Sequence, residues 1–311
     1  MPLWLSEEDV GSLITPDEAV PVIEESFLRM AAGQVELMPR RRFAVDGGAF
    51  AVMAAADRGL GTAGLKSYLA VEGRVQFVVC LFDLADGTLT AMIAADRLGQ
   101  ARTGAASGVA AKHLARPGAA SLGLFGAGWQ AESQLAAIRA AAPSIGRVVV
   151  SSRRAERAAA FAERHGAEVA ETPADAGACD IVVTATSSKD PVLRGDWLQE
   201  GALVCAIGAN DPRRRELDSQ VIVRATLVCC DSLEGAKLES GDLIEPVAAG
   251  QLDWLEVCEL HQIVAGELPG RQGHTDIVVF KSNGIAPWDV AIGHEVVRRA
   301  RERGVGTEVP V

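Results

Sequence analysis

A glycine-rich turn between a strand-like and a helix-like segment constrains the fold of this 311-residue chain more than any other feature. Residues 121–138 read SLGLFGAGWQAESQLAAI, in which Gly126, Gly128 and Ala131 fit the pattern GxGxxA directly after an apolar run. Gly126 permits a tight turn, Gly128 lets the backbone approach a phosphate, and Ala131 allows close packing of helix against strand. The N-terminus of the helix offers free N–H groups to a pyrophosphate. The pattern predicts a dinucleotide-binding loop, although glycine-rich turns also join strands to helices for purely structural reasons.

The segments after this turn alternate between helix-like and uniformly apolar runs. A helix-like run over 130–142 is followed by the strand-like RVVVSS and the charged helix-like RRAERAAAFAERHG. Further apolar runs are IVVTAT, ALVCAIG, ATLVCCD and DIVVF. Strands that are apolar on both faces are typical of parallel sheets covered by helices. This half of the chain is therefore predicted to be an α/β, Rossmann-type domain with a doubly wound parallel sheet.

The first part of the chain has a different pattern. Residues 16–32 place apolar side chains at helical spacing, and residues 41–95 contain short strand-like runs. Asp86-Gly87 separates the last two runs and predicts a tight hairpin, in which both turn positions need positive φ. We expect a smaller α+β domain with an antiparallel or mixed sheet, and a domain crossover where the helix-like stretch 102–114 ends before Pro117.

Length and composition narrow the class of protein. A chain of 311 residues with 49% apolar content can bury two ordinary cores. The 30 basic and 41 acidic residues give a net charge of -11, and the basic residues are scattered, which argues against nucleic acid as a partner. The first ten residues lack a signal-peptide pattern, and no 18 apolar residues follow one another. We expect a cytoplasmic protein with no membrane partner.

The six cysteines and five histidines show no spacing typical of a metal site. Most of the cysteines lie in apolar strand-like runs, so they are expected to be reduced and buried. The adjacent Cys229 and Cys230 could form a redox pair, but neighbouring residues of a strand point to opposite faces. No metal cofactor is predicted.

The end of the second strand of the Rossmann-type domain indicates which dinucleotide binds. In NAD-binding domains this strand normally ends in Asp or Glu, which binds the ribose 2′-OH. Here it ends in Ser151, Ser152, Arg153 and Arg154. Hydroxyl and guanidinium groups suit a 2′-phosphate, so NADP is preferred over NAD. The alternative is that these residues are an ordinary solvated helix start.

Three basic residues of the first domain are candidates for a substrate site. Lys66 lies in the apolar segment GLKSYLAV, where a buried ammonium group is costly unless it meets an anion or is neutral. The alternative is a lysine whose charge reaches water at a sheet edge. Arg41, in the basic run 40–42, and Arg102, at the expected start of a helix, could bind a carboxylate or phosphate, or could be surface arginines.

The chain resembles the ornithine cyclodeaminase and mu-crystallin family along nearly its whole length. Individual matches are loose, but their ordered combination is specific. They are Pro39 with Arg41, Met53, Lys66, the hairpin at Asp86-Gly87, Arg102 with Thr103, GAGWQA at 126–131, TATSS at 184–188, IGANDPRRRELD at 207–218, ESGDL at 239–243 and VVFKSNGIAPWDVA at 278–291.

The resemblance implies a domain arrangement and a set of site residues. Residues 1–116 and 285–311 would form a substrate-binding and dimerisation domain of a homodimer, and residues 117–284 the dinucleotide-binding domain. Arg41, Lys66 and Arg102 would surround a substrate carboxylate, with Asn210 completing the catalytic set. The choice of Arg41 among three tandem arginines rests on the Pro-x-Arg spacing. The implied cofactor-binding residues are Thr103, Gly126, Ala127, Gly128, Gln130, Ala131, Ser151, Ser152, Arg153, Arg154, Thr184, Thr186, Ser187, Ile207, Gly208, Ser282 and Gly284.

The resemblance also implies a reaction: hydride transfer between NADP(H) or NAD(H) and the α-carbon of a small amino acid, formed from a 2-oxo acid or a cyclic imine. Two alternatives stay open, a cyclodeaminase that converts ornithine to proline and ammonia, and a non-catalytic NADP-dependent binder. True ornithine cyclodeaminases carry an Asp at the position of Asn210 and a Glu at that of Ala51. Asp211 is one residue away and could substitute, so the two departures weaken the cyclodeaminase interpretation without excluding it.

Overall fold

The computed structural model describes residues 1–310, which divide into two compact units. Unit 1 is residues 1–105 together with the segment from Ile285 onward, and unit 2 is residues 106–284. The first division lies inside helix α3, Asp96–Leu114, and not at its end near residue 116. No helix within residues 1–310 is long and apolar enough to cross a membrane.

Unit 1 is built on a mixed, seven-stranded sheet in the order β15-β1-β6-β5-β4-β3-β2. Strands β1 and β6 pair in parallel, and the other neighbours pair antiparallel, as the sequence predicts. Besides α3, its elements are β1 Leu3–Leu5, α1 Glu7–Leu13, α2 Ala19–Ala31, β2 Val35–Val45, β3 Gly48–Asp57, β4 Thr62–Val71, β5 Arg74–Asp83, β6 Leu89–Ala94, α11 Ala286–Arg303 and β15 Thr307–Glu308.

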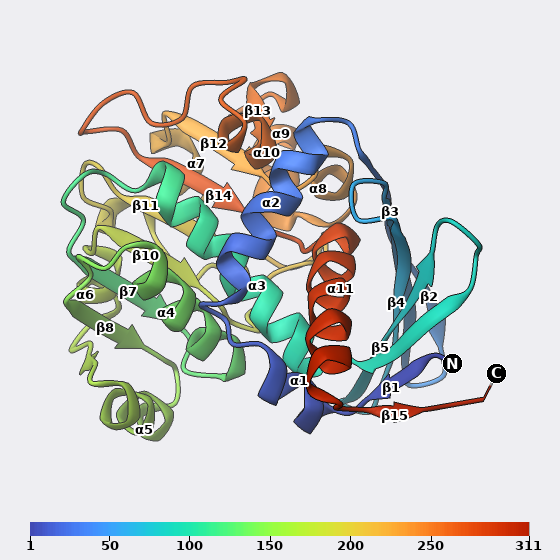
Figure 1. The fold of residues 1–311 in the computed structure, drawn as a ribbon. Helices are drawn as coiled ribbons and strands as arrows, with labels where there is room; N and C mark the ends of the chain where they lie inside the picture. Colours follow the sequence, from blue (N-terminus) through green and yellow to red (C-terminus); the bar gives the residue numbers. More distant parts are fainter. Residues whose placement is uncertain (311) are drawn as a thin grey trace. The chain divides into compact units, whose positions relative to one another are not determined.

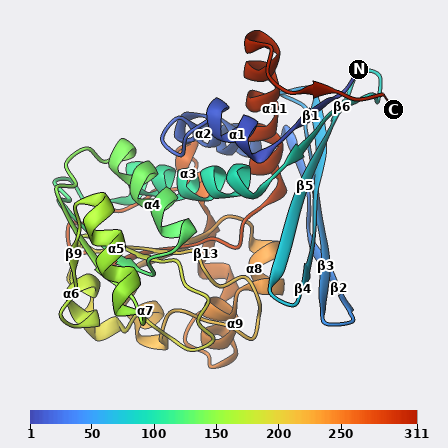
Figure 2. The same cartoon turned by 90° about the horizontal axis from the view of Figure 1, so that it is seen from below.

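The long helix α11 covers one face of this sheet (Figures 1 and 2). It packs on β3, β4 and β5, and α2 packs on α11. Residues alternate along the strands, so that Met53 and Lys66, which are cross-strand partners, both lie on the buried face. The C-terminal helix therefore brings residues from the end of the chain to the strand that carries Lys66.

Two local predictions for unit 1 are wrong in detail. Helix α3 begins at Asp96 and not near Arg102, because the side chain of Glu7 accepts hydrogen bonds from the N–H groups of Asp96 and Arg97 at 2.7 and 2.8 Å. A cap that comes from 90 residues away leaves no local signal. The β5–β6 connection is longer than a two-residue turn, and only Gly87 has positive φ, while the carboxylate of Asp86 accepts from Thr88.

Unit 2 is built on an eight-stranded, wholly parallel sheet in the order β13-β12-β14-β11-β10-β7-β8-β9. Its strands β10, β11 and β14 are buried at every position, which confirms the prediction from uniformly apolar runs. Its elements are β7 Ser121–Phe125, α4 Trp129–Ala141, β8 Arg147–Ser151, α5 Ala155–His165, β9 Glu168–Val169, α6 Pro173–Gly177, β10 Ile181–Thr184, η1 Gly195–Trp197, β11 Leu203–Ala206, α7 Ser219–Arg224, β12 Leu227–Cys230, α8 Leu233–Glu239, α9 Gly241–Ala248, η2 Trp254–Glu256, β13 Val257–Glu259, α10 Leu260–Val264 and β14 Val278–Lys281.

Candidate active site and dinucleotide-binding loops

Lys66 is buried in unit 1 and forms an ion pair with Asp289 of α11. The Lys66 Nζ lies 2.9 Å from Asp289 Oδ1, and both side chains are at least 96% buried. The ring of Phe77 lies 5.0 Å from the ammonium nitrogen. Gly99 lets α3 approach closely, because a Cβ there would lie 2.9 Å from Lys66 Nζ. These contacts exclude the alternative of a lysine whose charge reaches water at a sheet edge.

Arg102 lies at the same carboxylate. Its Nε is 3.4 Å from Asp289 Oδ1, and its guanidinium carbon lies 6.0 Å from the ring centre of Trp288. Arg102 Nε and Asp289 Oδ2 are both buried and make no hydrogen bond within residues 1–310. Buried polar atoms are nearly always hydrogen-bonded in native proteins. Asp289 Oδ2 is therefore a spare acceptor for a polar ligand, and Arg102 Nε is engaged only by its 3.4 Å ion pair with Asp289 Oδ1.

Arg40, and not the expected Arg41, is the third basic residue of this cluster. Arg40 is 8% exposed and its charge acts on Lys66 and Asp289, whereas Arg41 is exposed. The pairing of β2 with β3 shifts register between Met38 and Arg41, so the alternation of faces changes there. Pro39 lies in this irregular stretch, and it is the sequence signal for the change of face, because proline inside a strand often marks a bulge.

The charges of this cluster tune the ionisation of Lys66. Burial lowers the pKa of Lys66 to about 8; Arg102 and Arg40 add to the effect, and Asp289 opposes it. Burial alone would raise the pKa of Asp289, but Lys66 and Arg102 lower it. Three basic groups thus face one carboxylate, and the excess positive charge favours an anionic ligand. A lysine with a pKa near 8 can exchange a proton at neutral pH.

The predicted dinucleotide turn joins β7 to α4 in unit 2. Gly126 has φ +110°, and a Cβ there would lie 2.5 Å from the carbonyl oxygen of Ala185. Gly128 is the N-cap of α4, which has no side-chain cap, and the space where its Cβ would be is open. Ala131 is fully buried between helix and sheet. Uncapped N–H groups beside open space are what a pyrophosphate requires, so these residues fit the dinucleotide.

The four residues expected near the ribose lie beside this turn. The N–H of Gly126 donates to the carbonyl of Ser151 at 2.9 Å, which joins the ends of β7 and β8. Ser152 and the exposed Arg153 and Arg154 follow β8 directly, before α5 begins. No carboxylate occupies the end of β8. Exposed arginines at this position suit a 2′-phosphate or an ordinary solvated helix start.

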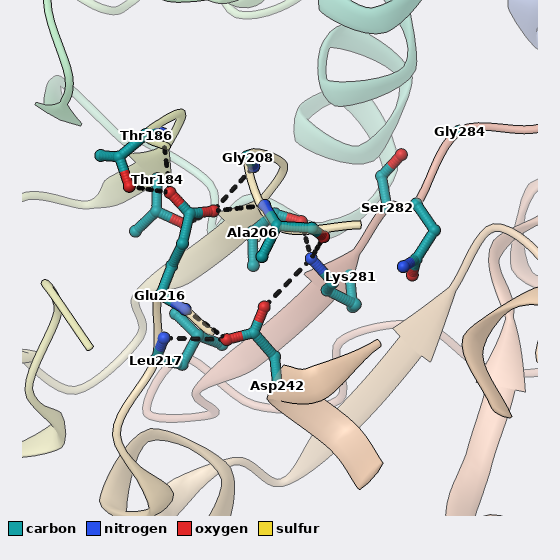
Figure 3. Close-up of polar contacts among 12 residues, drawn as sticks. Thr184, Thr186, Ala206, Gly208, Glu216, Leu217, Asp242, Lys281, Ser282 and Gly284 are labelled. Carbon is teal, nitrogen blue, oxygen red and sulfur yellow. Dashed lines mark hydrogen bonds and ion pairs between the residues drawn. The ribbon is translucent and has the colours of Figure 1, made fainter. Parts of the chain in front are cut away.

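The remaining expected cofactor residues lie after the strands of the same sheet. Thr184 ends β10, Ile207 and Gly208 follow β11, and Ser282 and Gly284 follow β14. The hydroxyls of Thr184 and Thr186 both donate to the buried Glu216 (Figure 3). Asp231 accepts from the Ser282 hydroxyl and from the N–H groups of Asn283 and Gly284. Ligands of open α/β sheets bind at the carboxyl ends of the strands, where these loops lie.

Several expected residues receive less support. Thr103 is buried and its hydroxyl donates to the Gly99 carbonyl within α3. Asn210 is exposed and lies two residues beyond Gly208. Ala127 and Gln130 are partly exposed in or just after the glycine turn, and Ser187 is exposed after β10.

Five buried charged residues in or beside the two candidate sites are not among the residues predicted from the sequence. Each lies in a segment that was matched to the family but was given no role, apart from Asp231, which directly follows an apolar run. A charged residue within or next to an apolar run is the sequence signal for such a position, as it is for Lys66. The residues missed are Glu216, Asp231, Asp242, Lys281 and Asp289. Within residues 1–310, no group of three or more His, Cys, Asp or Glu side chains is arranged to hold a metal ion.

Comparisons with known proteins identify the family of this chain. Residues 2–304 match the family described as the ornithine cyclodeaminase/mu-crystallin family. An alanine dehydrogenase of Archaeoglobus fulgidus is 34% identical over an alignment of 319 positions, which covers 99% of this chain and 98% of that protein. The Thermococcus litoralis Delta(1)-pyrroline-2-carboxylate reductase in complex with NADH and L-proline is 31% identical, with a TM-score of 0.93 over 99% of this chain and 100% of that chain. An archaeal alanine dehydrogenase dimer with bound NAD is 33% identical, with a TM-score of 0.93 over 99% of each chain.

Proposed function

Because the chain belongs to the ornithine cyclodeaminase/mu-crystallin family, we propose that it catalyses reversible hydride transfer between NAD(P)H and the α-carbon of a small amino acid. In the reductive direction the substrate is a cyclic imine, or a 2-oxo acid together with ammonia. Relatives named alanine dehydrogenase and pyrroline-2-carboxylate reductase support both forms of this substrate.

The buried cluster around Lys66 carries this proposal. Arg40 and Arg102 supply the positive charge that binds the substrate carboxylate, which fixes the position of the α-carbon. Asp289 Oδ2 offers an unused acceptor to an imine or amine N–H. A ligand with one carboxylate and one nitrogen on the adjacent carbon satisfies both groups.

Lys66 moves the proton of the reaction. During reduction of the C=N bond, Lys66 Nζ donates a proton to the nitrogen, and during oxidation it accepts that proton. Its pKa of about 8 lets both forms exist near neutral pH. Asp289 orients the ammonium group through the 2.9 Å contact. The nicotinamide ring, when bound, supplies or accepts the hydride.

The chain's own residues support the cofactor assignment. The open N-terminus of α4 suits the pyrophosphate, and Ser151, Ser152, Arg153 and Arg154 favour NADP at the ribose. The matched solved structures hold NADH or NAD. We therefore propose that the chain binds either dinucleotide and prefers NADP.

The cyclodeaminase alternative has weaker support from the site. The position expected to carry a Glu is Ala51, which lies on the buried face of β3 beside Met53 and has no proton acceptor. Asn210 cannot accept a proton. Hydrogen bonds from Arg213 lower the pKa of Asp211 to about 2, so this carboxylate is already engaged. Neither departure from the cyclodeaminase pattern is compensated nearby.

The outer face of the unit 1 sheet supports a homodimer. Two cross-strand rows run over β3, β4, β5 and β6 on the face away from α11: Val52, Ser67, Val78 and Ala94, and Ala54, Leu65, Cys80 and Met92. All eight are apolar or small and only partly buried. An apolar sheet face of this kind is typical of an interface, and a related alanine dehydrogenase is a dimer.

The six free cysteines support a reducing, cytoplasmic compartment.

Absorbance of NADPH and NADH tests the proposed reaction. Purified protein is assayed with pyrroline-2-carboxylate, piperideine-2-carboxylate, and pyruvate with ammonia. Lys66→Ala should abolish oxidation of the cofactor, and Arg40→Ala should raise KM by about tenfold or more, because a charge-assisted contact to the carboxylate is lost. Arg41→Ala, a change at the exposed neighbour, is the matched control and should leave KM unchanged. Ligand binding without turnover, or equal effects of the two arginine variants, would contradict the assignment.

A further inference from the structure

Glu216 is a fully buried carboxylate at the carboxyl ends of β10 and β11. Its Oε1 accepts from the N–H and the hydroxyl of Thr186, at 2.7 and 2.6 Å. Its Oε2 accepts from the N–H groups of Gly208 and Ala209, at 2.7 and 3.2 Å, and from the Thr184 hydroxyl at 3.0 Å. Five donors from the last residue of β10 and from the loops after β10 and β11 therefore converge on one side chain (Figure 3).

A second pair of buried charges holds the segment that carries Glu216. Asp242 Oδ1 accepts from the N–H groups of Glu216 and Leu217, at 2.7 and 2.9 Å. Lys281 Nζ lies 3.0 Å from Asp242 Oδ2 and donates to the Ala209 carbonyl at 2.6 Å. The backbone of Glu216 is thus attached to the start of α9, and the loop after β11 is attached to the end of β14.

The two loops are also packed too closely for any side chain at residue 208. A Cβ on Gly208 would lie 2.3 Å from the carbonyl oxygen of Thr186 and 2.6 Å from Glu216 Oε1. The loop after β10 in turn contacts the glycine turn, since the N–H of Ala185 donates to the carbonyl of Phe125 at 2.8 Å. The position of Glu216 therefore determines the spacing between these loops.

Burying the charged side chain of Glu216 between these loops costs desolvation free energy. Burial raises the pKa of Glu216, and it outweighs the five donors and the nearby Lys281, which favour the charged form. The buried position therefore disfavours the carboxylate form that these donors would bind best. Apolar residues of similar volume often replace buried charges without loss of stability. The carboxylate is better explained by the conformation that it imposes on the loops.

We propose that Glu216 is a positioning residue that fixes the loops after β10 and β11 in the conformation that binds the nicotinamide half of the dinucleotide. The inference rests on the proposed function, because it assumes that a dinucleotide binds. Glu216 occupies the inward-facing N–H groups of both loops and thereby excludes an external anion from them. The pyrophosphate is left to the uncapped N-terminus of α4.

The test compares Glu216→Gln with Asp180→Asn. Asp180 is also buried and also accepts from backbone N–H groups, those of Ala120 and Ser121, but it precedes β10 and so lies at the opposite, amino end of the strands of the same sheet. Glutamine keeps the shape of Glu216, but its NH₂ group replaces one accepting oxygen and faces groups that are themselves donors, so those hydrogen bonds are lost. NADH affinity, measured by fluorescence titration, should fall about tenfold or more in Glu216→Gln and stay within about twofold of wild type in Asp180→Asn.

Hydrogen exchange without cofactor gives the second readout. Amides of residues 186, 208 and 209 should exchange faster in Glu216→Gln than in Asp180→Asn. The exchange rates are compared after correction for the global stability of each variant, which thermal unfolding measures. If Glu216→Gln does not fold, Glu216→Asp, which keeps the charge but draws it back, should show the same local increase in exchange. Unchanged exchange and unchanged NADH affinity would overturn the proposal. If the wild-type chain itself binds neither NADH nor NADPH, the proposed function fails, and loop exchange still decides the role of Glu216.

Discussion

Lys66 shows how one buried amine can be both held and made reactive. The apolar strand around it disfavours the ammonium form, and Asp289 favours it, so the two effects leave the pKa near 8. An isolated buried lysine would be neutral, and one paired with a carboxylate at the surface would stay charged. The position of Asp289 on α11 is therefore as important for the proposed chemistry as the lysine itself.

A pH profile tests this balance. If Lys66 donates the proton during reduction, kcat/KM for imine reduction should fall as the pH rises through about 8, and the oxidative reaction should gain over the same range. Asp289→Asn removes the charge that raises the lysine pKa, so the falling limb should move to lower pH. Asp57→Asn, which removes another buried carboxylate of the same sheet, is the control and should not move it. A limb that stays in place, or moves to higher pH, in Asp289→Asn would contradict this role.

The arginines show where residue-level prediction stops. Spacing from Pro39 selected Arg41, but the structure buries Arg40, because an irregularity in β2 changes which residues face inward. Lys66 and Arg102 were found, since each stands out locally in an apolar or motif context. Asp289, which completes the cluster, stands next to apolar residues in the sequence, but nothing local shows that it pairs with Lys66, which is 223 residues away.

At the scale of elements, the parallel sheet was predictable and several element ends were not. Uniformly apolar strands and the glycine turn predicted unit 2, since both signals are local. Helix α3 began earlier than predicted because Glu7, far away in sequence, caps it. The loops after β10 and β11 were recognised by position, but their attachment to Glu216 depends on contacts that form only in the fold.

The residues between β8 and α5 are predicted to make the chain prefer NADPH over NADH. Replacement of Arg153 and Arg154 by alanine should weaken NADPH binding by about tenfold and leave NADH binding nearly unchanged, because only the 2′-phosphate loses a charged partner. Both affinities can be measured by fluorescence titration. Arg157→Ala removes an exposed charge of α5 and should affect neither cofactor. Unchanged binding of both cofactors would show that these arginines are only part of a solvated helix start, and equal losses for NADPH and NADH would show that they do not select the 2′-phosphate.

At the scale of the whole molecule, the two groups of candidate site residues lie in separate units. Lys66, Arg102 and Asp289 lie in unit 1, and the glycine turn and the strand-end loops lie in unit 2. The chain returns to unit 1 through α11, which brings Asp289 to the cluster. This return was predicted from the family resemblance and not from periodicity, because nothing local shows where the last helix packs.

The exposed sheet face predicts the assembly state. Light scattering of the purified chain should give the mass of a dimer, and Val78→Glu, in the middle of an outward-facing row, should shift it to the mass of a monomer. The added carboxylate would have to be buried without a partner in the interface. Gln251→Glu adds the same charge on an exposed residue of unit 2 and should leave the dimer intact. A wild-type monomer, or a dimer unaffected by Val78→Glu, would show that this face is not the interface.

Transfer of deuterium from reduced cofactor to product tests the central claim most directly. The chain is supplied with cofactor labelled at C4 of the nicotinamide, separately on each face, and with pyrroline-2-carboxylate or with pyruvate and ammonia; products are analysed by mass spectrometry. We expect one deuterium at the α-carbon of proline or alanine when one face of the nicotinamide carries the label, and none with Lys66→Ala. Unlabelled product, or no product from these substrates while ornithine yields proline and ammonia with no net consumption of cofactor, would contradict it.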